Sequence, residues 1–541
     1  MQRRGSKSAL RARPVAVATA GAAPQAVSSG WIISPIWDSL LFIGAPVTCI
    51  LALFPLRKYW QPQEYSFLLL AFLTFGHHLP GFIRAYGDRE LLARYRLRFL
   101  LAPPLIFFTT LWFDLRGLHG LVIFIFTWDI WHVLMQHYGF MRIYDAKRGE
   151  ISPVTARMDW AISIFWYLTL IVASPHYRHN LLLQAYTSGI PLLSPQVFKV
   201  LENVLYGMTG GVTVVYLGYN LYLWRKGRLC PRKLVLLATF LAASYYLYVY
   251  VDDFIVGFAV WSAFHCIQYY GIVWVYNSSR VAKGSAMTRG VRFLFRPRTA
   301  LVLIYAALIL GYGGINYLQK FVHDEAFRRV LLTFIATSSA MHYYYDGFIW
   351  KVREKETRQF LNIGAVRGAL RRALPAWNRG PVQAAYLAAT IVVLAGLETW
   401  HPNDELRVRQ SLAAVAPGAE ESHFHLGETL RQQGRLAGAL EEYREALRLN
   451  PAWAQAHVNL GVTLAGLGQL REAIVAYEKA LAIDSKIPAA HFNLAGLLAS
   501  RGEIERALRH YQNALEGDDP DARRLARVAI EELRSGRFMS R

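Results

Sequence analysis

The sequence predicts an all-α protein in which a polytopic bundle of about eleven transmembrane helices precedes a C-terminal α-solenoid. Three observations predict this architecture. The chain of 541 residues is 54% hydrophobic and 14% aromatic, which is richer in apolar side chains than soluble proteins usually are. Its first 400 residues contain a succession of apolar runs about 20 residues long, the length that crosses a bilayer. The remainder repeats a pattern every 34 residues instead.

The first 30 residues are basic but contain no strong apolar core. Their charges come from Arg3, Arg4, Lys7, Arg11 and Arg13, and residues 14–30 are mostly Ala, Ser, Gly and Pro. A signal peptide needs an apolar central region. We therefore expect residues 1–30 to be a disordered cytoplasmic tail.

The transmembrane domain is expected over residues 31–400. Its third and fourth apolar runs are separated by only a few residues, which predicts a tight helical hairpin. The runs lie near 31–56, 65–86, 98–115, 118–141, 158–175, 204–224, 233–251, 254–276, 300–319, 330–350 and 382–399.

Loop charges orient this domain. With the N-terminus in the cytoplasm, the tail and the inside loops contain 33 Lys and Arg, against 8 in the outside loops. The positive-inside rule predicts this asymmetry, and an odd number of spans places the C-terminal domain outside. We expect an integral protein of a bacterial inner membrane with a cytoplasmic N-terminus and an extracytoplasmic C-terminal domain.

The net charge of +22 does not indicate nucleic-acid binding, because its position follows the membrane segments. Residues 1–400 hold 41 Lys and Arg against 18 Asp and Glu, whereas residues 401–541 hold 18 against 19. The three cysteines, Cys49, Cys230 and Cys266, are too far apart in the sequence for a CxxC metal site or a disulfide framework.

After an expected linker at residues 401–420, residues 421–541 follow the 34-residue period. Four consensus positions recur: Gly434, Gly468 and Gly502; Tyr443, Tyr477 and Tyr511; Ala446, Ala480 and Ala514; and Leu447, Leu481 and Leu515. This pattern closely resembles the tetratricopeptide repeat (TPR), whose paired helices stack into a concave groove. The resemblance implies three repeats, a trailing helix near 521–534, and binding of a protein or peptide. His423, His457 and His491 share the period, which assigns them to the repeat structure.

Ionisable side chains inside apolar spans are costly, so each needs a partner or a purpose. Four expected spans carry histidines roughly 10 to 14 residues from their outer ends, which places them at one depth, slightly to the cytoplasmic side of the midplane. These candidate metal ligands are His77, His78, His132, His265 and His342.

Helical spacing adds polar neighbours, because residues three, four or seven apart share a face. His137 is five residues from His132 and points away from it, so it is left out. The neighbours expected to orient the ligands are Asp129, Gln136, Gln268, Asp346 and Arg84.

Imidazoles combined with carboxylate and amide groups predict a metal centre, with iron, another transition metal or a haem between two histidines. The alternative is a buried polar network that only fixes helix packing. The arrangement distantly resembles membrane-bound desaturases and hydroxylases, which gather HxxxH and HxxHH boxes near the cytoplasmic face. Here the pair His77-His78 stands alone and the spacing from His132 to His137 is HxxxxH. These ligands fit one metal or a haem better than a two-iron centre.

The sequence thus predicts a membrane-embedded metal- or haem-dependent enzyme, a redox enzyme acting on a lipid-like substrate, with repeats that bind a protein. One alternative is a non-enzymatic anchor that displays the repeats to an envelope complex. The other is a lipid-linked glycosyltransferase, a class that is similar in having a polytopic domain and an external repeat tail. That class holds a divalent ion on acids of an early external loop. Residues 57–63 contain no acid, and Asp252-Asp253 lies between the seventh and eighth spans.

Overall fold

The computed structural model describes residues 30–349, 359–361, 380–400 and 404–535, apart from the single residues 151, 252, 286 and 518. Within these ranges the regular elements are helices, and one isolated bridge joins Asp88 to Met287. The tail expected over residues 1–30 lies outside the described residues except for Gly30.

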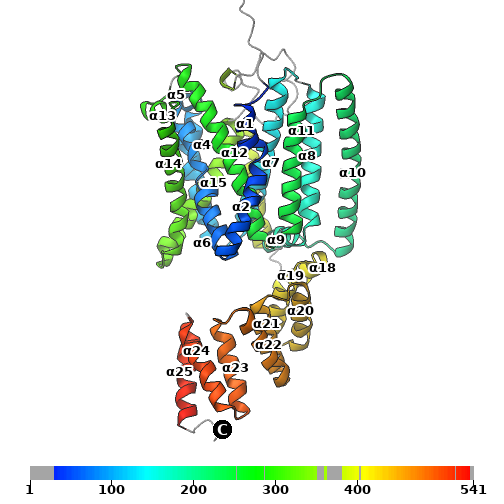
Figure 1. Ribbon diagram of the computed structural model, residues 1–541, viewed down its shortest axis with the longest axis vertical. Coiled ribbons are helices and arrows are strands. Elements are labelled where there is room, and N and C mark those ends of the chain that lie inside the picture. Colours follow the sequence, from blue (N-terminus) through cyan, green and yellow to red (C-terminus); the bar gives the residue numbers. More distant parts are fainter. Residues whose placement is uncertain are drawn as a thin grey trace, which may run out of the picture.

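The chain forms two parts, a helical bundle and a row of shorter helices at one end of it (Figure 1). The first half of the bundle contains α1 (Pro35–Asp38), η1 (Ser39–Ile43), α2 (Ala45–Tyr59), α3 (Pro62–Leu68), η2 (Leu69–Phe75), α4 (His78–Gly87), α5 (Arg89–Arg94), α6 (Arg96–Leu115), α7 (Gly120–Lys147) and α8 (Pro153–Ala173). The second half contains α9 (Pro175–Thr187), α10 (Pro195–Arg225), α11 (Pro231–Tyr245), η3 (Tyr246–Tyr250), α12 (Phe254–Ala282), α13 (Arg289–Leu294), α14 (Thr299–Tyr317), η4 (Leu318–Lys320), α15 (Glu325–Ile349) and α17 (Gly380–Trp400).

Each of the eleven apolar runs lies on helical structure, but fewer qualify as spans. In the described part of the chain, seven helices are long and apolar enough to cross a membrane, and an eighth span results if the pair Pro35–Ile43 and Ala45–Leu53, bent by 58°, counts as one. The runs at 118–141, 330–350 and 382–399 form α7, α15 and α17, which are not among the seven. Polar side chains lower the hydropathy of α7 and α15. Eleven spans therefore remain a prediction.

Three π-helical segments interrupt helices that the sequence predicts to be continuous. These segments are η1, η2 and η3. A π-helix shifts the backbone hydrogen bonds from i→i+4 to i→i+5 and often marks a functional site. The segment η2 ends at Phe75, two residues before His77.

The basic loops between spans contact one another at one end of the bundle. Arg228 donates to Glu150 at 2.6 Å, Arg280 forms an ion pair with Asp88, and Lys283 Nζ donates to the Gln359 carbonyl at 2.5 Å. In Figure 1, α5 and α13 lie at this end, whereas α9 and α18 lie at the other. The loops expected inside thus share one end, and the repeats adjoin the opposite one.

The C-terminal helices pack as antiparallel pairs. Local packing explains why certain residues recur in each repeat. A Cβ on Gly461 would lie 2.6 Å from Tyr477 Cε1, so glycine allows the two helices of the repeat to approach each other. Gly434, Gly468 and Gly502 have φ between +73° and +78°, a conformation that favours glycine. The helices are α18 (Glu405–Val415), α19 (Glu420–Gln432), α20 (Leu436–Leu449), α21 (Ala454–Gly466), α22 (Leu470–Ile483), α23 (Pro488–Ser500), α24 (Ile504–Glu516) and α25 (Pro520–Arg534).

The segment 401–420, expected to be a linker, contains α18. This helix packs on α9 because Val408 and Leu412 form an apolar cluster with Tyr186. Residues 401–403 lie outside the described residues.

Candidate metal centre

Five buried histidines from four segments of the bundle meet at one place. His77 is the residue before α4, His78 is the first residue of α4, His132 lies on α7, His265 on α12 and His342 on α15. Each is at most 9% exposed. The His77 ring centroid lies 4.3 Å from that of His342, 5.2 Å from that of His265 and 6.2 Å from that of His132. The candidate ligands named from the sequence are therefore neighbours in space.

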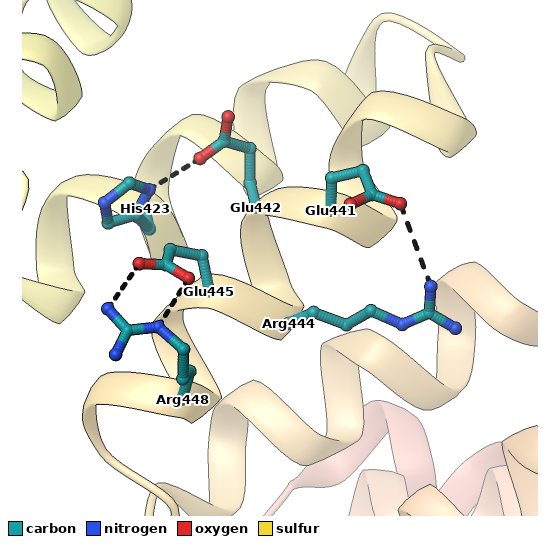
Figure 2. A pocket seen from close by; sticks show the side chains of 6 residues that line it. All are labelled: His423, Glu441, Glu442, Arg444, Glu445 and Arg448. Atoms are coloured by element: carbon teal, nitrogen blue, oxygen red, sulfur yellow. Dashed lines mark hydrogen bonds and ion pairs between the residues drawn. The ribbon is translucent and has the colours of Figure 1, made fainter.

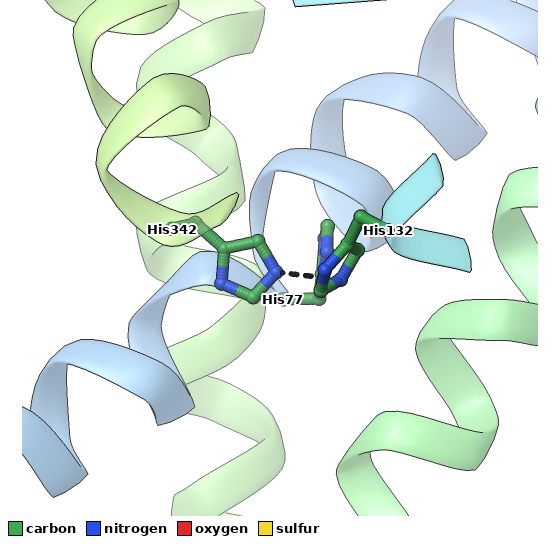
Figure 3. A group of neighbouring side chains, drawn as sticks. All are labelled: His77, His132 and His342. Atoms are coloured by element: carbon green, nitrogen blue, oxygen red, sulfur yellow. Dashed lines mark hydrogen bonds between the residues drawn. The ribbon is translucent and has the colours of Figure 1, made fainter. Parts of the chain in front are cut away.

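Three of these imidazoles direct nitrogens toward a common point. Nitrogen atoms of His77, His132 and His342 lie within 4.8 Å of one another (Figure 3). His132 Nε2 and His342 Nε2 lie 3.2 Å apart. Nitrogens at this separation either share a proton or bind a common cation.

The backbone fixes the tautomer of His77. Its Nδ1 is hydrogen-bonded to the carbonyl of Thr74, in the π-helical segment η2. Because a carbonyl only accepts, Nδ1 must donate, and Nε2 keeps its lone pair. This Nε2 is buried and has no hydrogen-bond partner among the described residues. A histidine in this state is prepared to bind a metal ion through Nε2.

Asp346 adds a carboxylate to the cluster. Its Oδ2 lies 3.7 Å from His342 Nε2 and 3.9 Å from His132 Nε2. Its other oxygen, Oδ1, accepts a 3.0 Å hydrogen bond from the Tyr269 hydroxyl. Tyr269 thereby holds the carboxylate beside the two imidazoles.

His78 and His265 flank the converging nitrogens. His78 Nδ1 lies 2.9 Å from Ser338 Oγ, and its ring is 4.9 Å from that of His342. The His265 ring lies 5.0 Å from that of His132. Among the described residues, neither ring nitrogen of His265 has a hydrogen-bond partner. Buried polar atoms in proteins are nearly always satisfied, so these two nitrogens are candidates for binding a ligand.

The remaining residues expected to orient ligands lie farther from the converging nitrogens. Asp129 accepts a 2.8 Å hydrogen bond from Tyr343, whose ring is 5.2 Å from that of His132. Gln136 Nε2 donates to the His265 carbonyl at 3.0 Å. Gln268 Nε2 donates to the Phe42 carbonyl at 2.7 Å, in η1, and Arg84 donates to Tyr276 at 3.2 Å. Of the five residues expected to orient ligands, Asp346 is thus the one that approaches the nitrogens of His132 and His342.

Sequence reasoning missed four residues that hold the histidines or their partners: Thr74, Tyr269, Ser338 and Tyr343. A signal existed for Tyr269, which lies four residues after His265 and shares its helix face. Ser338 likewise lies four residues before His342. The role of Thr74 depends on its carbonyl, which no side-chain pattern reveals.

Other candidate residues have structural partners. His137 stacks on Phe240 with ring centroids 4.0 Å apart. His423, His457 and His491 each direct Nε2 to a carbonyl six residues earlier, at 3.3, 3.0 and 3.0 Å. Asp253 caps α12 by accepting from the Val256 N–H, and Asp252 lies outside the described residues.

An open pocket on the repeats is lined by charges that pair among themselves (Figure 2). His423 contacts Glu442 at 2.7 Å, and Arg448 contacts Glu445 at 2.7 Å. Arg444 lies 3.8 Å from Glu441. Because every drawn charge has a counter-charge, this pocket does not indicate a strongly charged ligand.

Comparisons with known proteins concern the C-terminal part. Three models described as TPR repeat or tetratricopeptide repeat match residues 427–468, 454–486 and 490–524. Residues in this region therefore form a TPR domain, as the 34-residue period predicts. The search among curated proteins finds no match.

Solved structures also match part of the chain. A crystal structure of MamA protein is 23% identical, with 25% of this chain and 76% of that chain covered and a TM-score of 0.21. A second crystal structure of MamA is 16% identical, with 31% and 97% covered and a TM-score of 0.21.

Proposed function

We propose that this chain is a membrane-embedded metal-dependent enzyme, a redox enzyme whose substrate is lipid-like, and that its TPR domain binds a protein partner. The observation that carries the proposal is the convergence of His77, His132 and His342, whose nitrogens lie within 4.8 Å of one another inside the bundle. Burying imidazoles next to one another is costly unless something occupies the space between their lone pairs.

The geometry favours a single ion over a haem. Two nitrogens bound to one ion at about 2.0–2.1 Å lie about 3 Å apart when they are adjacent ligands, and about 4 Å apart when they face each other across the ion. The 3.2 Å between His132 Nε2 and His342 Nε2 matches adjacent ligands. A haem needs its axial ligands on opposite faces of the macrocycle, whereas these imidazoles contact one another directly.

The donor set supports a redox ion. Imidazole ligands suit iron, copper and zinc, and two histidines with one carboxylate form the facial triad of non-haem iron enzymes. His132, His342 and Asp346 supply that set, with His77 as a third imidazole. The ion would supply redox or Lewis-acid chemistry, while these residues would bind and orient it and Tyr269 would hold the Asp346 carboxylate in place.

The position of the centre supports the proposal of a lipid-like substrate. The histidines lie within helices that pack as a bundle, and α7 exposes Trp131 by 46% at the position next to His132. An apolar molecule in the bilayer would therefore meet α7 close to the centre. The repeats would then recruit a protein on the side expected to be extracytoplasmic.

The competing interpretation is a membrane anchor whose histidines form only a polar network. Metal analysis of the detergent-purified chain, together with its visible spectrum, distinguishes the metal-dependent enzyme from the membrane anchor. We expect close to one equivalent of a transition metal without a Soret band. A Soret band would identify haem instead, and absence of both metal and haem would favour the anchor.

A further inference from the structure

A group of arginines lies on α13 and the residues that follow it, at the end of the bundle that the charge pattern places inside (Figure 1). Arg289, Arg292, Arg296 and Arg298 are all exposed. In the part of the chain that the structure describes, none of these four side chains forms an ion pair. Residues 254–323 contain no Asp or Glu, so the segment supplies no counter-charge of its own.

Other basic residues at the same end of the bundle have carboxylate partners. Arg228 pairs with Glu150 at 2.6 Å, and Arg280 pairs with Asp88. The backbone of Asp88 bridges to Met287, directly before α13, but its carboxylate is already used by Arg280. The counter-charge of the α13 arginines therefore comes from the solvent or from a bound anion.

Packing on the bundle holds this segment in one orientation. The Thr288 N–H donates to the Gly87 carbonyl at 2.9 Å. A Cβ on Gly87 would lie 2.4 Å from Val291 Cγ2, so glycine lets α13 approach α4. Leu294 and Phe295 are buried in an apolar cluster that includes residues of α14. Because these apolar side chains face inward, the arginines are left on the outer side.

An aromatic ring lies exposed among the arginines. Phe293 is 53% exposed and shares a helix face with Arg289, four residues earlier. The guanidinium of Arg296 lies 5.8 Å from the centroid of the Phe293 ring. The next helix, α14, begins at Thr299 and is one of the seven that are long and apolar enough to cross a membrane. Basic and aromatic side chains directly beside a membrane span lie at the level of the lipid headgroups.

We propose that this surface, made of Arg289, Arg292, Phe293, Arg296 and Arg298, binds anionic phospholipids of the surrounding bilayer. The guanidinium groups would donate to phosphate oxygens, for which the planar fork of arginine is suited. Phe293 would enter the apolar boundary beneath the headgroups. Clusters of roughly four or more basic residues beside a membrane helix recognise anionic lipids in this way. The proposal rests on the membrane placement of the proposed function but not on its metal centre.

Electron spin resonance of lipids around the full chain tests the proposal. Metal-free protein is reconstituted in phosphatidylcholine vesicles with a trace of spin-labelled phosphatidylglycerol or spin-labelled phosphatidylcholine, and the motionally restricted fraction of each label measures its association with the protein. The wild type should prefer phosphatidylglycerol. Arg292→Gln combined with Arg296→Gln should lower this preference by about threefold or more. Because no metal is present, a failed metal centre does not affect the result.

Arg225→Gln combined with Lys226→Gln is the matched control, because it removes the same charge at the same end of the bundle. These residues end α10, which Figure 1 places on the opposite side of the bundle from α13 and α14. The control should keep most of the preference. Equal association of both lipids with the wild type would overturn the proposal and leave an acidic protein as the partner. Equal loss in both double variants would overturn it too, because net charge alone would then explain the preference.

Discussion

His265 illustrates how the histidine cluster differs from an ordinary buried network. Both of its ring nitrogens are buried and lack a hydrogen-bond partner among the described residues. Each such atom costs about 1–3 kcal/mol. In contrast, Lys233 lies 3.0 Å from Asp145 and 3.1 Å from Asp159 and is well paired. The unsatisfied nitrogens of His265 cost stability, which fits the coordination site that we propose, whereas the ion pairs of Lys233 contribute to packing.

This contrast gives a prediction for the metal-free protein. His265→Leu removes unsatisfied polar atoms without breaking a hydrogen bond of the imidazole, so it should leave the thermal midpoint unchanged or raise it. Lys233→Met removes a positive charge from beside the buried carboxylates of Asp145 and Asp159. It should lower the free energy of unfolding by about 3–5 kcal/mol. Thermal unfolding of both variants in detergent checks this. A large loss of stability in His265→Leu would favour the structural network.

Asp346 offers a test of the carboxylate in the proposed donor set. Asp346→Asn keeps the size of the side chain and removes its charge, so we expect the metal to bind about 10- to 100-fold more weakly. Competition with a chromophoric chelator measures the change. Asp129→Asn, farther from the converging nitrogens, is the control and should have a smaller effect. Equal affinities for wild type and Asp346→Asn would exclude the carboxylate from the centre.

Spacing along a single helix predicted part of the site. His342 and Asp346 are four positions apart and lie close together in the structure. His137 is five positions after His132 and stacks on Phe240 instead. Contacts between helices were beyond such reasoning. Arg84 and Gln268 were expected to orient the histidines. Instead, Arg84 donates to Tyr276 and Gln268 donates to the Phe42 carbonyl. These partners come from other helices, and spacing along one helix does not predict such contacts.

At the scale of elements, the repeats were predicted closely and the bundle helices less so. The 34-residue period follows from local rules, since Gly461 admits Tyr477 and Gly468 adopts a left-handed φ. The π-helical segments were missed because apolar residues such as those of η2 carry no signal for a widened turn. Yet η2 supplies the Thr74 carbonyl that fixes His77.

The first repeat contains a histidine whose charge should affect stability. His423 Nε2 donates to the Pro417 carbonyl, so a contact of Nδ1 with Glu442 at 2.7 Å requires protonation of both nitrogens. Burial lowers the pKa of His423, but Glu442 outweighs burial and raises the pKa above its usual 6.5. The resulting stabilisation is complete below pH 6.5 and is lost as pH rises through the raised value.

Thermal unfolding of a fragment of residues 403–541 at pH 6 and pH 9 measures this effect. Between pH 6 and pH 9, the free energy of unfolding of the wild type should fall by on the order of 1 kcal/mol more than that of His423→Gln. His457→Gln is the matched control, since Ala476 occupies in the second repeat the position that Glu442 has in the first. An unfolded fragment, or identical pH dependence in His423→Gln and wild type, would contradict the prediction.

The whole molecule has two ends of different character. Loops that the charge pattern places inside contact one another at one end, and the TPR domain adjoins the other through α9 and α18. The positive-inside rule then predicts an extracytoplasmic TPR domain. A reporter active only outside the cytoplasm should work when fused after residue 405 and fail when fused after residue 290. The reverse pattern would overturn the topology and the parity of the span count.

The central claim is that three imidazoles of the bundle hold one metal ion. Metal content per purified chain tests it most directly, compared between His132→Ala, His342→Ala and the control His137→Ala. Water is scarce at this depth and cannot replace a lost ligand, so metal should collapse in the first two variants. It should persist in His137→Ala, whose ring stacks on Phe240. Full metal content in the His132 and His342 variants, or equal loss in all three, would contradict the account.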